Sequence, residues 1–305
     1  MGVGSVGVIV VTYRSGAILR ECLAAILNDG AVGHVVVVDN GNGDAERAYL
    51  DRMADRVDVV RPSRNIGFAA GCNLGAAMAR GEYLAFVNPD LIVSPGALGR
   101  IAHELSQRPA AWVAGPRLLD VHGVEQRGGR RDVLTPWRCL VETTGVWRLF
   151  PGHPHFQRFN WHQAAEPSGV AEVPTISGAC MVVPVGRWRQ LGGMDDSFFL
   201  HVEDIDLCLR VLKAGGRVLY CTEVPVIHHG QSSDAPCLFV ELHKAKGLVR
   251  YFRKHFADSY PSWSLRVLEV LIWGHFMALA PFRMVRGGGR HERSAGPGHA
   301  VDSTP

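Results

Sequence analysis

"VGVIVVTYRSGAILRECLAAILNDGAVGHVVVVDN", residues 6–40, contains two apolar runs separated by an amphipathic segment. Residues 6–13 and 34–40 are almost continuous in apolar and β-branched side chains, which is typical of strands buried on both faces of a parallel sheet. Between them, residues 17–28 repeat apolar side chains at helical spacing. A strand, a helix and a second strand in this order predict one unit of an open α/β sheet.

The alternation continues as far as residue 90. Residues 44–54 and 67–80 have the residue types of helices, and residues 57–62 and 82–90 those of short strands. Because strand and helix alternate four times, we expect an α/β fold. Its core would be a single Rossmann-like, mostly parallel sheet flanked by helices, with right-handed crossovers.

The regular pattern ends near residue 125. Residues 127–172 combine arginine, tryptophan and proline, and predict an irregular, partly helical insertion. Strand-like runs return at residues 172–184 and 217–229. Between these runs, FFLHVEDIDLCLRVLKAGG (198–216) predicts a helix that begins at a cluster of carboxylates and ends at two glycines.

Glu203, Asp204 and Asp206 form that cluster. They are either solvated charges that favour a helix N-terminus, or one of them accepts a proton from a substrate. Asp206 lies four residues before Arg210, a spacing that predicts an ion pair along the helix. The residues alone leave both interpretations open for Glu203 and Asp204.

Polar residues also follow three of the expected strands, at Thr12, Asp39 and Asn88–Pro89–Asp90. In open α/β sheets, ligands bind outside the carboxyl ends of the strands. Asp90 could supply the carboxylate that a hard cation takes beside substrate phosphate oxygens. Asn-Pro-Asp is also a common turn signal, so a metal role and a structural role both remain open.

The composition excludes several classes. A net charge of +3 is too small to indicate nucleic-acid binding. The seven cysteines are widely spaced without a C-x-x-C pair, which argues against a disulfide framework or zinc ribbon and favours a reducing cytosol. The start of the chain lacks a basic region before its apolar run, so we interpret it as a first strand and not as a signal peptide.

The apolar stretch at residues 268–282 contains Glu269 and His275 and is fifteen residues long. It is shorter than the about twenty residues of a membrane-spanning helix. With Trp263 and Trp273 beside it and arginines after it, it predicts either an amphipathic helix in a membrane interface or a packed C-terminal helix.

Some partial motifs fail on their context. GVGSVG (2–7) precedes the first strand, whereas a dinucleotide fingerprint follows it. No P-loop pattern occurs. His201–Glu203 resembles part of a zinc deaminase signature, but the second cysteine that should follow Cys237 is absent. His153, His155 and His162 lack a carboxylate or cysteine at regular spacing, which disfavours a zinc site there.

Six segments in fixed order carry a resemblance to a known family. They are VIVVTYRSG (8–16), VVVVDNGNGD (35–44), RNIGFAAGCNLG (64–75), YLAFVNPD (83–90), ISGACMVVPVGRWRQLGGMDDSFFLHVEDIDLCLR (176–210) and VIHHGQSS (226–233). Together they resemble family 2 glycosyltransferases of the GT-A fold, and most closely the bacterial rhamnosyltransferase-like members, over roughly residues 6–235.

The resemblance implies a donor site and a metal site. The implied nucleotide-binding residues are Thr12, Tyr13, Asp39, Asn65, Gly67, Asn73 and Asn88. Asn88 replaces the first Asp of the family's D-x-D motif, which leaves Asp90, with His228, as the implied ligands of Mg²⁺ or Mn²⁺. His229 is the alternative to His228. Strand-end capping and helix packing are alternative roles for Asp39 and Gly67.

The resemblance also implies the chemistry. Asp204 matches the family's catalytic base, and Glu203 would bind the acceptor or orient the loop. The implied acceptor side is Ser177, Gly178, Ala179, Trp137 and Trp161. Arg130 and Arg131 suit a lipid diphosphate. For these arginines and for the tryptophans, packing within the insertion is the alternative.

The expected architecture is a GT-A domain at 1–240 with the acceptor-side insertion at 127–172, a C-terminal amphipathic helical segment at 241–286 and a disordered tail at 287–305. The expected function is inverting, metal-dependent transfer of a sugar in bacterial cell-surface polysaccharide synthesis. The donor would be dTDP-rhamnose, with UDP- or GDP-sugars as alternatives. The acceptor would be a saccharide or a polyprenyl-diphosphate-linked glycan.

We expect a cytoplasmic protein that is peripheral on the inner face of the plasma membrane. Two other functions stay open from the sequence. One is a sugar-nucleotide-binding regulatory or scaffold protein without turnover, which the Glu203–Asp204 pair disfavours. The other is a nucleotidyltransferase, which usually has a basic glycine-rich loop after the first strand that TYRSG (12–16) matches poorly.

Overall fold

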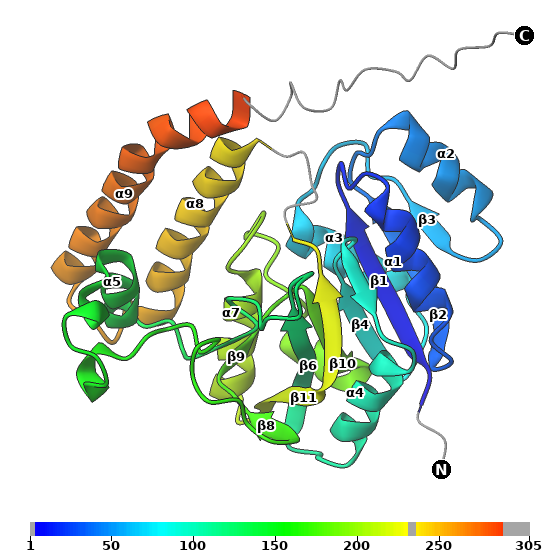
Figure 1. The fold of residues 1–305 in the computed structure, drawn as a ribbon, viewed down its shortest axis with the longest axis horizontal. Coiled ribbons are helices and arrows are strands. Elements are labelled where there is room, and N and C mark those ends of the chain that lie inside the picture. The colour runs from blue at the N-terminus through cyan, green and yellow to red at the C-terminus, as the bar shows by residue number, and fades with distance from the viewer. Residues whose placement is uncertain (1–3, 231–235, 289–305) are drawn as a thin grey trace, which may run out of the picture.

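The computed structural model describes residues 4–230 and 236–288. Within them, a nine-stranded sheet forms the centre of the molecule and helices cover its faces (Figure 1). The strand order is β3-β2-β1-β4-β10-β6-β11-β5, and β8 also pairs with β11. The strands are β1 (Val6–Thr12), β2 (Val32–Asp39), β3 (Asp58–Val60), β4 (Tyr83–Val87), β5 (Leu91–Val93), β6 (Ala111–Leu119), β8 (Val170–Glu172), β10 (Cys180–Pro184) and β11 (Arg217–His228).

The N-terminal half of the sheet is parallel, as its buried, β-branched strands predict. β1 lies between β2 and β4, and Thr12 is in register with Asp39. The carboxyl ends of β1, β2 and β4 therefore leave the same edge of the sheet. The α/β prediction is confirmed.

The other half of the sheet is mixed. β10 runs antiparallel between β4 and β6, and β11 is parallel to β6 and antiparallel to β5. The sequence patterns gave no element to residues 91–125, although β5, the helix α4 (Ala97–Ser106) and β6 lie there. For β6 the reason is that Gly115 and Pro116 interrupt a strand that is nevertheless central.

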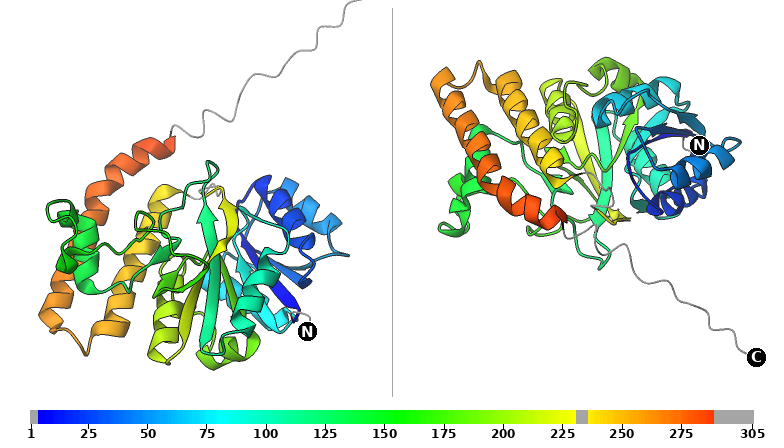
Figure 2. Two further views of the ribbon diagram at one scale, coloured as in Figure 1. Left: turned by 60° about the horizontal axis from the view of Figure 1, so that its bottom comes forward. Right: turned by 90° about the horizontal axis from the view of Figure 1, so that it is seen from above.

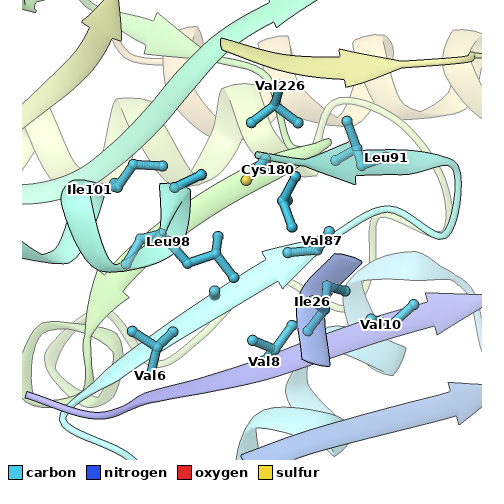
Figure 3. Close-up of a cluster of buried hydrophobic side chains, with 14 of the residues drawn as sticks. Val6, Val8, Val10, Ile26, Val87, Leu91, Leu98, Ile101, Cys180 and Val226 are labelled. Atoms are coloured by element: carbon cyan, nitrogen blue, oxygen red, sulfur yellow. The ribbon is translucent and has the colours of Figure 1, made fainter. Parts of the chain in front are cut away.

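Alternate side chains of β1 point into two different cores. Val8 and Val10 pack with α1 and α4, together with Ile26, Leu98 and Ile101 (Figure 3). On the opposite face, Ile9 and Val11 pack with α3, α6 and α7. These helices and the neighbouring α2 are α1 (Ile18–Leu27), α2 (Asp44–Arg52), α3 (Phe68–Met78), α4 (Ala97–Ser106), α6 (Val185–Leu191) and α7 (Glu203–Lys213).

The insertion is attached to the main sheet by a second, two-stranded sheet. β7 (Arg130–Arg131) pairs antiparallel with β9 (Thr175–Ile176), close before β10. Beyond β7 the insertion contains α5 (Pro136–Thr144) and the short 3-10 turns η1 (Val146–Arg148) and η2 (Pro154–Phe156). Its long irregular connections agree with the proline-rich sequence.

The C-terminal part is a hairpin of two helices, α8 (Cys237–Phe256) and α9 (Ser262–Gly288). A third apolar cluster joins Ile205 of α7, Tyr251 of α8 and Ile272 of α9. Figure 2 shows α9 on the outer side of α8. Among the helices of the described residues, none combines the length and the apolar character needed to cross a bilayer. Most of the expected tail, from residue 289, lies outside the described residues.

Candidate active site

Asp90 and His228 meet at the edge where β4 and β11 end. The Asn88–Pro89–Asp90 turn sends the chain back as β5, and β5 pairs with β11 so that Leu91 is opposite His228. His228 Nε2 lies 3.2 Å from Asp90 Oδ1. The backbone N–H of His229 donates to the carbonyl of Asp90, and its side chain is exposed. The geometry thus aims His228, and not His229, at the carboxylate.

Gln126 orients the His228 ring, because its Oε1 lies 2.5 Å from His228 Nδ1. With the ring proton on Nδ1, Nε2 presents a lone pair to Asp90, an arrangement typical of histidines that bind metals. Two acceptor atoms at this separation need a proton or a cation between them. In the described residues, no group of three or more His, Cys, Asp or Glu could hold a metal. The Asp90–His228 pair fits a cation that takes its other ligands from substrate phosphates.

Asp39 is fully buried, and its carboxylate is surrounded by donors. Oδ1 accepts hydrogen bonds from the backbone N–H groups of Gly41 and Asn42 and from the Asn42 side chain, at 2.9 to 3.1 Å. Oδ2 lies 3.3 Å from Nε of Arg61 and 3.8 Å from Nε of Arg47. Both arginines are partly exposed, so Oδ2 is the atom that an incoming ligand could share.

Thr12 and Tyr13 lie beside this carboxylate. Thr12 Oγ1 is 2.6 Å from Ser15 Oγ and 3.2 Å from Asn42 Oδ1. Thr12 thus helps to orient Asn42, whose side chain donates to Asp39. The half-buried Tyr13 ring packs against Gly41. The predicted base-binding residues therefore form one network at the ends of β1 and β2.

Asn65, Gly67 and Asn73 connect α3 to the segment before α7. Asn65 Oδ1 accepts a hydrogen bond from the Gly67 N–H at 2.9 Å. Gly67 has φ +89, and a Cβ there would lie 2.5 Å from the carbonyl oxygen of Phe199. The Asn73 side chain bonds both the N–H and the carbonyl of Met194. In the structure Gly67 and Asn73 contact the segment before α7, and Asn65 bonds the N–H of Gly67. Their predicted contact with a nucleotide stays a prediction.

Residues 177–179 link the Asn88 turn to α7. The Asn88 N–H donates to the Ala179 carbonyl at 2.8 Å. The Gly178 N–H donates to Asp204 Oδ2 at 2.9 Å. Two hydrogen bonds to adjacent residues thus connect the Asn88 turn and the Asp204 carboxylate through one short backbone segment, which begins at Ser177.

Asp204 is buried but charged. Its Oδ2 also accepts a hydrogen bond from Arg131 at 2.5 Å, and its Oδ1 accepts one from the Ile205 N–H at 2.8 Å. Burial by itself would raise the pKa of Asp204. The Arg131 guanidinium and the N–H donors outweigh that effect and hold the pKa of this carboxyl below its usual value.

Glu203 has the opposite environment. It is buried, and within the described part of the chain its Oε2 has no hydrogen-bond partner. Burial, and next the negative charge of Asp204, raise the pKa of Glu203 to about 8. At neutral pH, Glu203 is therefore mostly protonated while Asp204 is ionised. Adjacent carboxyl groups with separated pKa values are typical of acid–base sites.

Asp206 belongs to a different network. Its fully buried carboxylate accepts from Arg210 Nε at 2.7 Å, which confirms the predicted ion pair. Lys254 Nζ at 2.7 Å and His255 Nε2 at 2.8 Å also contact it, and both come from α8. Burial would raise the pKa of Asp206, but the bonds from His255, Lys254 and Arg210 lower it to about 2.

The turn before α7 is strained. His201 and Val202 have φ of +64 and +73, a left-handed conformation that costs side-chain-bearing residues roughly 1–3 kcal/mol each. Val202 is buried against α8, where Gly247 leaves room for its side chain. Packing of α8 thus holds the turn that presents Glu203 and Asp204.

The insertion residues are mostly occupied by internal contacts. Trp137 Nε1 donates to the His155 carbonyl at 2.7 Å, and its ring packs against those of His155 and Phe156. Trp161 packs against the core below α6 and α7. Arg130 is buried and bonds both carboxylate oxygens of Glu125.

Sequence reasoning missed Gln126 and did not connect Arg131 with Asp204. Gln126 follows β6 in a segment without a pattern. Arg131 was considered for a lipid diphosphate, although its real partner is 73 positions away. The opposite charges of Arg131 and Asp204 are the available signal in the sequence, but only the fold shows that these two residues are neighbours.

Comparisons with known proteins agree with this geometry. Residues 7–163 match the family described as Glycosyl transferase family 2. An N-acetylglucosaminyl-diphospho-decaprenol L-rhamnosyltransferase of Mycobacterium tuberculosis is 26% identical over 310 residues, which cover 94% of each chain. The low-salt glycan biosynthesis hexosyltransferase Agl10 of Haloferax volcanii is 24% identical over 73% of this chain and 66% of its own.

Solved structures share the fold. A mannosyltransferase from Pyrobaculum calidifontis, in complex with GDP-Man and Mn²⁺, has a TM-score of 0.55 and 16% identity over 96% of this chain and 76% of its own. GalNAc-T7 with UDP, GalNAc and Mn²⁺ has a TM-score of 0.56 and 14% identity over 90% of this chain and 55% of its own.

Proposed function

The chain belongs to glycosyl transferase family 2 and is a glycosyltransferase with the GT-A fold, and we propose that it is an inverting, metal-dependent rhamnosyltransferase. Its donor is dTDP-rhamnose, and its acceptor is a saccharide carried on a polyprenyl diphosphate. The Mycobacterium tuberculosis relative is an N-acetylglucosaminyl-diphospho-decaprenol L-rhamnosyltransferase, which supports the sugar and the acceptor class. The reaction belongs to cell-surface glycan synthesis.

The observation that carries the proposal is the position of residues 177–179. This segment bonds the Asn88 turn, which leads to Asp90, through the Ala179 carbonyl, and the Asp204 carboxylate through the Gly178 N–H. A transfer with inversion needs both a base and a leaving-group site next to the sugar. The two groups that this segment connects supply one candidate for each.

The proton transfer is assigned to Asp204. The acceptor oxygen forms a bond to C1 of the sugar while the bond from C1 to the diphosphate oxygen breaks, which inverts C1. Asp204, ionised at neutral pH, takes the proton of the acceptor hydroxyl. Glu203, mostly protonated, does not compete for this proton and is available as a hydrogen-bond donor.

The diphosphate leaves at the Asp90–His228 end. These two residues would hold Mg²⁺ or Mn²⁺, and the cation would neutralise charge on the departing diphosphate. Gln126 would keep the His228 ring oriented toward it. Asp39 Oδ2 would accept the ring N–H of the pyrimidine base, in place of one of the two arginines that contact it now.

The C-terminal hairpin supports a location at the inner face of the plasma membrane. One face of α9 exposes five large apolar side chains, which are 48–69% exposed: Trp263, Val267, Val270, Leu271 and Met277. Beside it, a groove between α8 and α9 is lined by Lys246, Arg250, Arg253, Lys254 and Glu269. Arg253 pairs with Glu269, and Lys254 pairs with Asp195 and Asp206. Lys246 and Arg250 are therefore the cations of this groove that suit an anionic bilayer surface, at about 1 kcal/mol each.

Flotation with vesicles tests this location. Wild type should float with phosphatidylglycerol vesicles and much less with phosphatidylcholine alone. Val270→Asp and the Lys246→Glu, Arg250→Glu double variant should both weaken flotation. Arg52→Glu, an exposed charge reversal on α2, is the matched control. Equal flotation of all four proteins would remove the hairpin from the proposal.

Calorimetric titration tests the donor site. We expect dTDP to bind more tightly than UDP or GDP, to need Mn²⁺ or Mg²⁺ for full affinity, and to lose that metal dependence in Asp90→Ala. A transfer assay with dTDP-rhamnose and a lipid-diphosphate sugar then identifies the product and its anomeric configuration. No binding of any nucleotide, or a product that retains the donor's configuration, would refute the proposal.

A further inference from the structure

Arg131 reaches the catalytic helix from the insertion. It lies on β7, where it is in register with Thr175 of β9. Because successive side chains of a strand point to opposite faces, Arg130 turns toward Glu125 while Arg131 turns toward α7. Arg131 is buried, with its guanidinium over the Phe159 ring at 5.7 Å.

One nitrogen of Arg131 makes two hydrogen bonds. Nη2 donates to the Ile176 carbonyl at 2.7 Å and to Asp204 Oδ2. The carbonyl belongs to β9, so the guanidinium is fixed by the same small sheet that carries it. Lysine could supply the charge, but its single flexible ammonium group would not reproduce this planar geometry.

The oxygens of Asp204 are used unequally. Oδ2 accepts from two donors, Arg131 and the Gly178 N–H, whereas within the described residues Oδ1 accepts from the Ile205 N–H alone. A carboxylate oxygen offers about two lone-pair positions. Oδ1 therefore keeps a position for an acceptor hydroxyl, and Oδ2 does not.

We propose that Arg131 is a positioning residue of the transfer reaction, which keeps Asp204 ionised and makes Oδ1 the atom that receives the acceptor's proton. This inference rests on the proposed role of Asp204 as the base. It also means that the insertion at 127–172 supplies part of the catalytic centre through β7, in addition to any contact it makes with the acceptor.

Other ionisable groups around Asp204 do not replace Arg131. Those that interact with it directly are Glu203 and Cys208 on α7 and His201 before α7. Beyond them, Lys244 and Glu241 of α8 act on His201, Asp206 acts on Glu203, and Tyr251 of α8 interacts with Asp206 and Cys208. Within the described residues, Arg131 is the cation that forms an ion pair with the Asp204 carboxylate. Without it, burial and the neighbouring acids would both favour the protonated form of Asp204.

The sign of the pH effect follows. Wild-type Asp204 has a lowered pKa, so it loses its charge only as the pH falls below the usual range of an aspartate. In Arg131→Gln, the pKa of Asp204 rises, because the carboxylate loses the cation beside it. The acid limb of kcat/KM should therefore move to higher pH, by roughly 1–3 pH units for the loss of one close opposite charge. Arg131→Lys should keep the limb near its wild-type position and lower kcat.

The experiment compares kcat/KM of wild type, Arg131→Gln and Arg131→Lys between pH 3 and 9, a range that begins below the usual pKa of an aspartate, with dTDP affinity and thermal unfolding as checks on the fold. Arg138→Gln removes another insertion arginine, which pairs with Asp132 at 2.7 Å, and should leave the limb unmoved. An acid limb at the same pH in wild type and Arg131→Gln would overturn the inference. If Arg131→Gln does not fold, the limb of Arg131→Lys decides. A limb shifted as far as 1–3 units would then refute the role of the charge.

A second readout does not need turnover. The carboxyl signals of ¹³C-labelled aspartate, assigned with Asp204→Asn, report the pKa of Asp204 directly. We expect it to be low in wild type and higher in Arg131→Gln. An unchanged pKa refutes the inference even in an active enzyme. If the pKa of Asp204 is raised in Arg131→Gln but the wild type transfers no sugar, the contact between Arg131 and Asp204 has the proposed effect and the proposed function is wrong.

Discussion

The two halves of the site are built differently. At the ends of β1 and β2, Asp39 bonds Asn42, three positions away, and the longest contact of this network, from Thr12 to Asn42, spans 30 positions. Around α7 and β11, the partners are distant: Arg131 and Asp204 are 73 positions apart, and Gln126 and His228 are 102 apart. The first half lies within one strand–helix–strand unit and the turn after it, whereas the second joins segments that are far apart in the chain.

The largest effect that can test this difference is the loss of the Asp204 charge. Asp204→Asn should lower kcat by about 10²–10⁴-fold, because general base catalysis contributes that much, and leave dTDP affinity unchanged. Glu203→Gln is the matched control. Its amide imitates the protonated acid that Glu203 is at neutral pH, so its kcat should fall much less. Equal losses would mean that the two carboxyl groups do not have separate roles.

A stability measurement sharpens the comparison next. Asp206→Asn should destabilise the protein by about 3–5 kcal/mol at pH 7, because it removes the buried anion that Arg210, Lys254 and His255 share. The exposed Asp51, which pairs with Arg61 at 2.7 Å in the N-terminal half, is the control, and Asp51→Asn should cost no more than about 1 kcal/mol. Urea unfolding measures both. Similar costs would show that burial of the network matters little.

The same carboxylate sets an acid limit. Since the pKa of Asp206 is lowered to about 2 from 3.8, its contribution to stability is complete above the unfolded value and is lost as the pH falls through the folded one. We expect the difference in free energy of unfolding between wild type and Asp206→Asn to decrease as the pH falls from 3.8 to about 2.

The smallest of these effects concerns the metal. Gln126→Ala should weaken the affinity for Mn²⁺ in the presence of dTDP by about 10–100-fold, because groups that orient a metal-binding histidine have effects of that size. Gln107→Ala, an exposed change after α4, should have none. Calorimetry gives both numbers, and an unaffected Gln126→Ala would remove Gln126 from the site.

The same contrast explains what the sequence could predict. The βαβ pattern, the strand-end residues and the Asp206–Arg210 pair all depend on neighbours within one turn or one crossover, and these predictions agree with the structure. The strand β6, with Gly115 and Pro116, has no such pattern because its stability comes from the two strands beside it. Arg131 and Gln126 acquire their meaning from residues that only the sheet topology brings near.

The Asp206 network has a consequence for the order in which the chain is made. The Asp206 carboxylate can contact Lys254 and His255 only after they have been synthesised, 48 and 49 residues later. Until then, a docked α7 would bury a carboxylate with Arg210 as its one cation within the described residues. We therefore expect that the parallel N-terminal half can fold early during translation, whereas α7 packs stably only after α8 has left the ribosome. Protease protection of α7 in stalled chains should therefore begin only after residue 255 has emerged, and protection before that point would contradict this order.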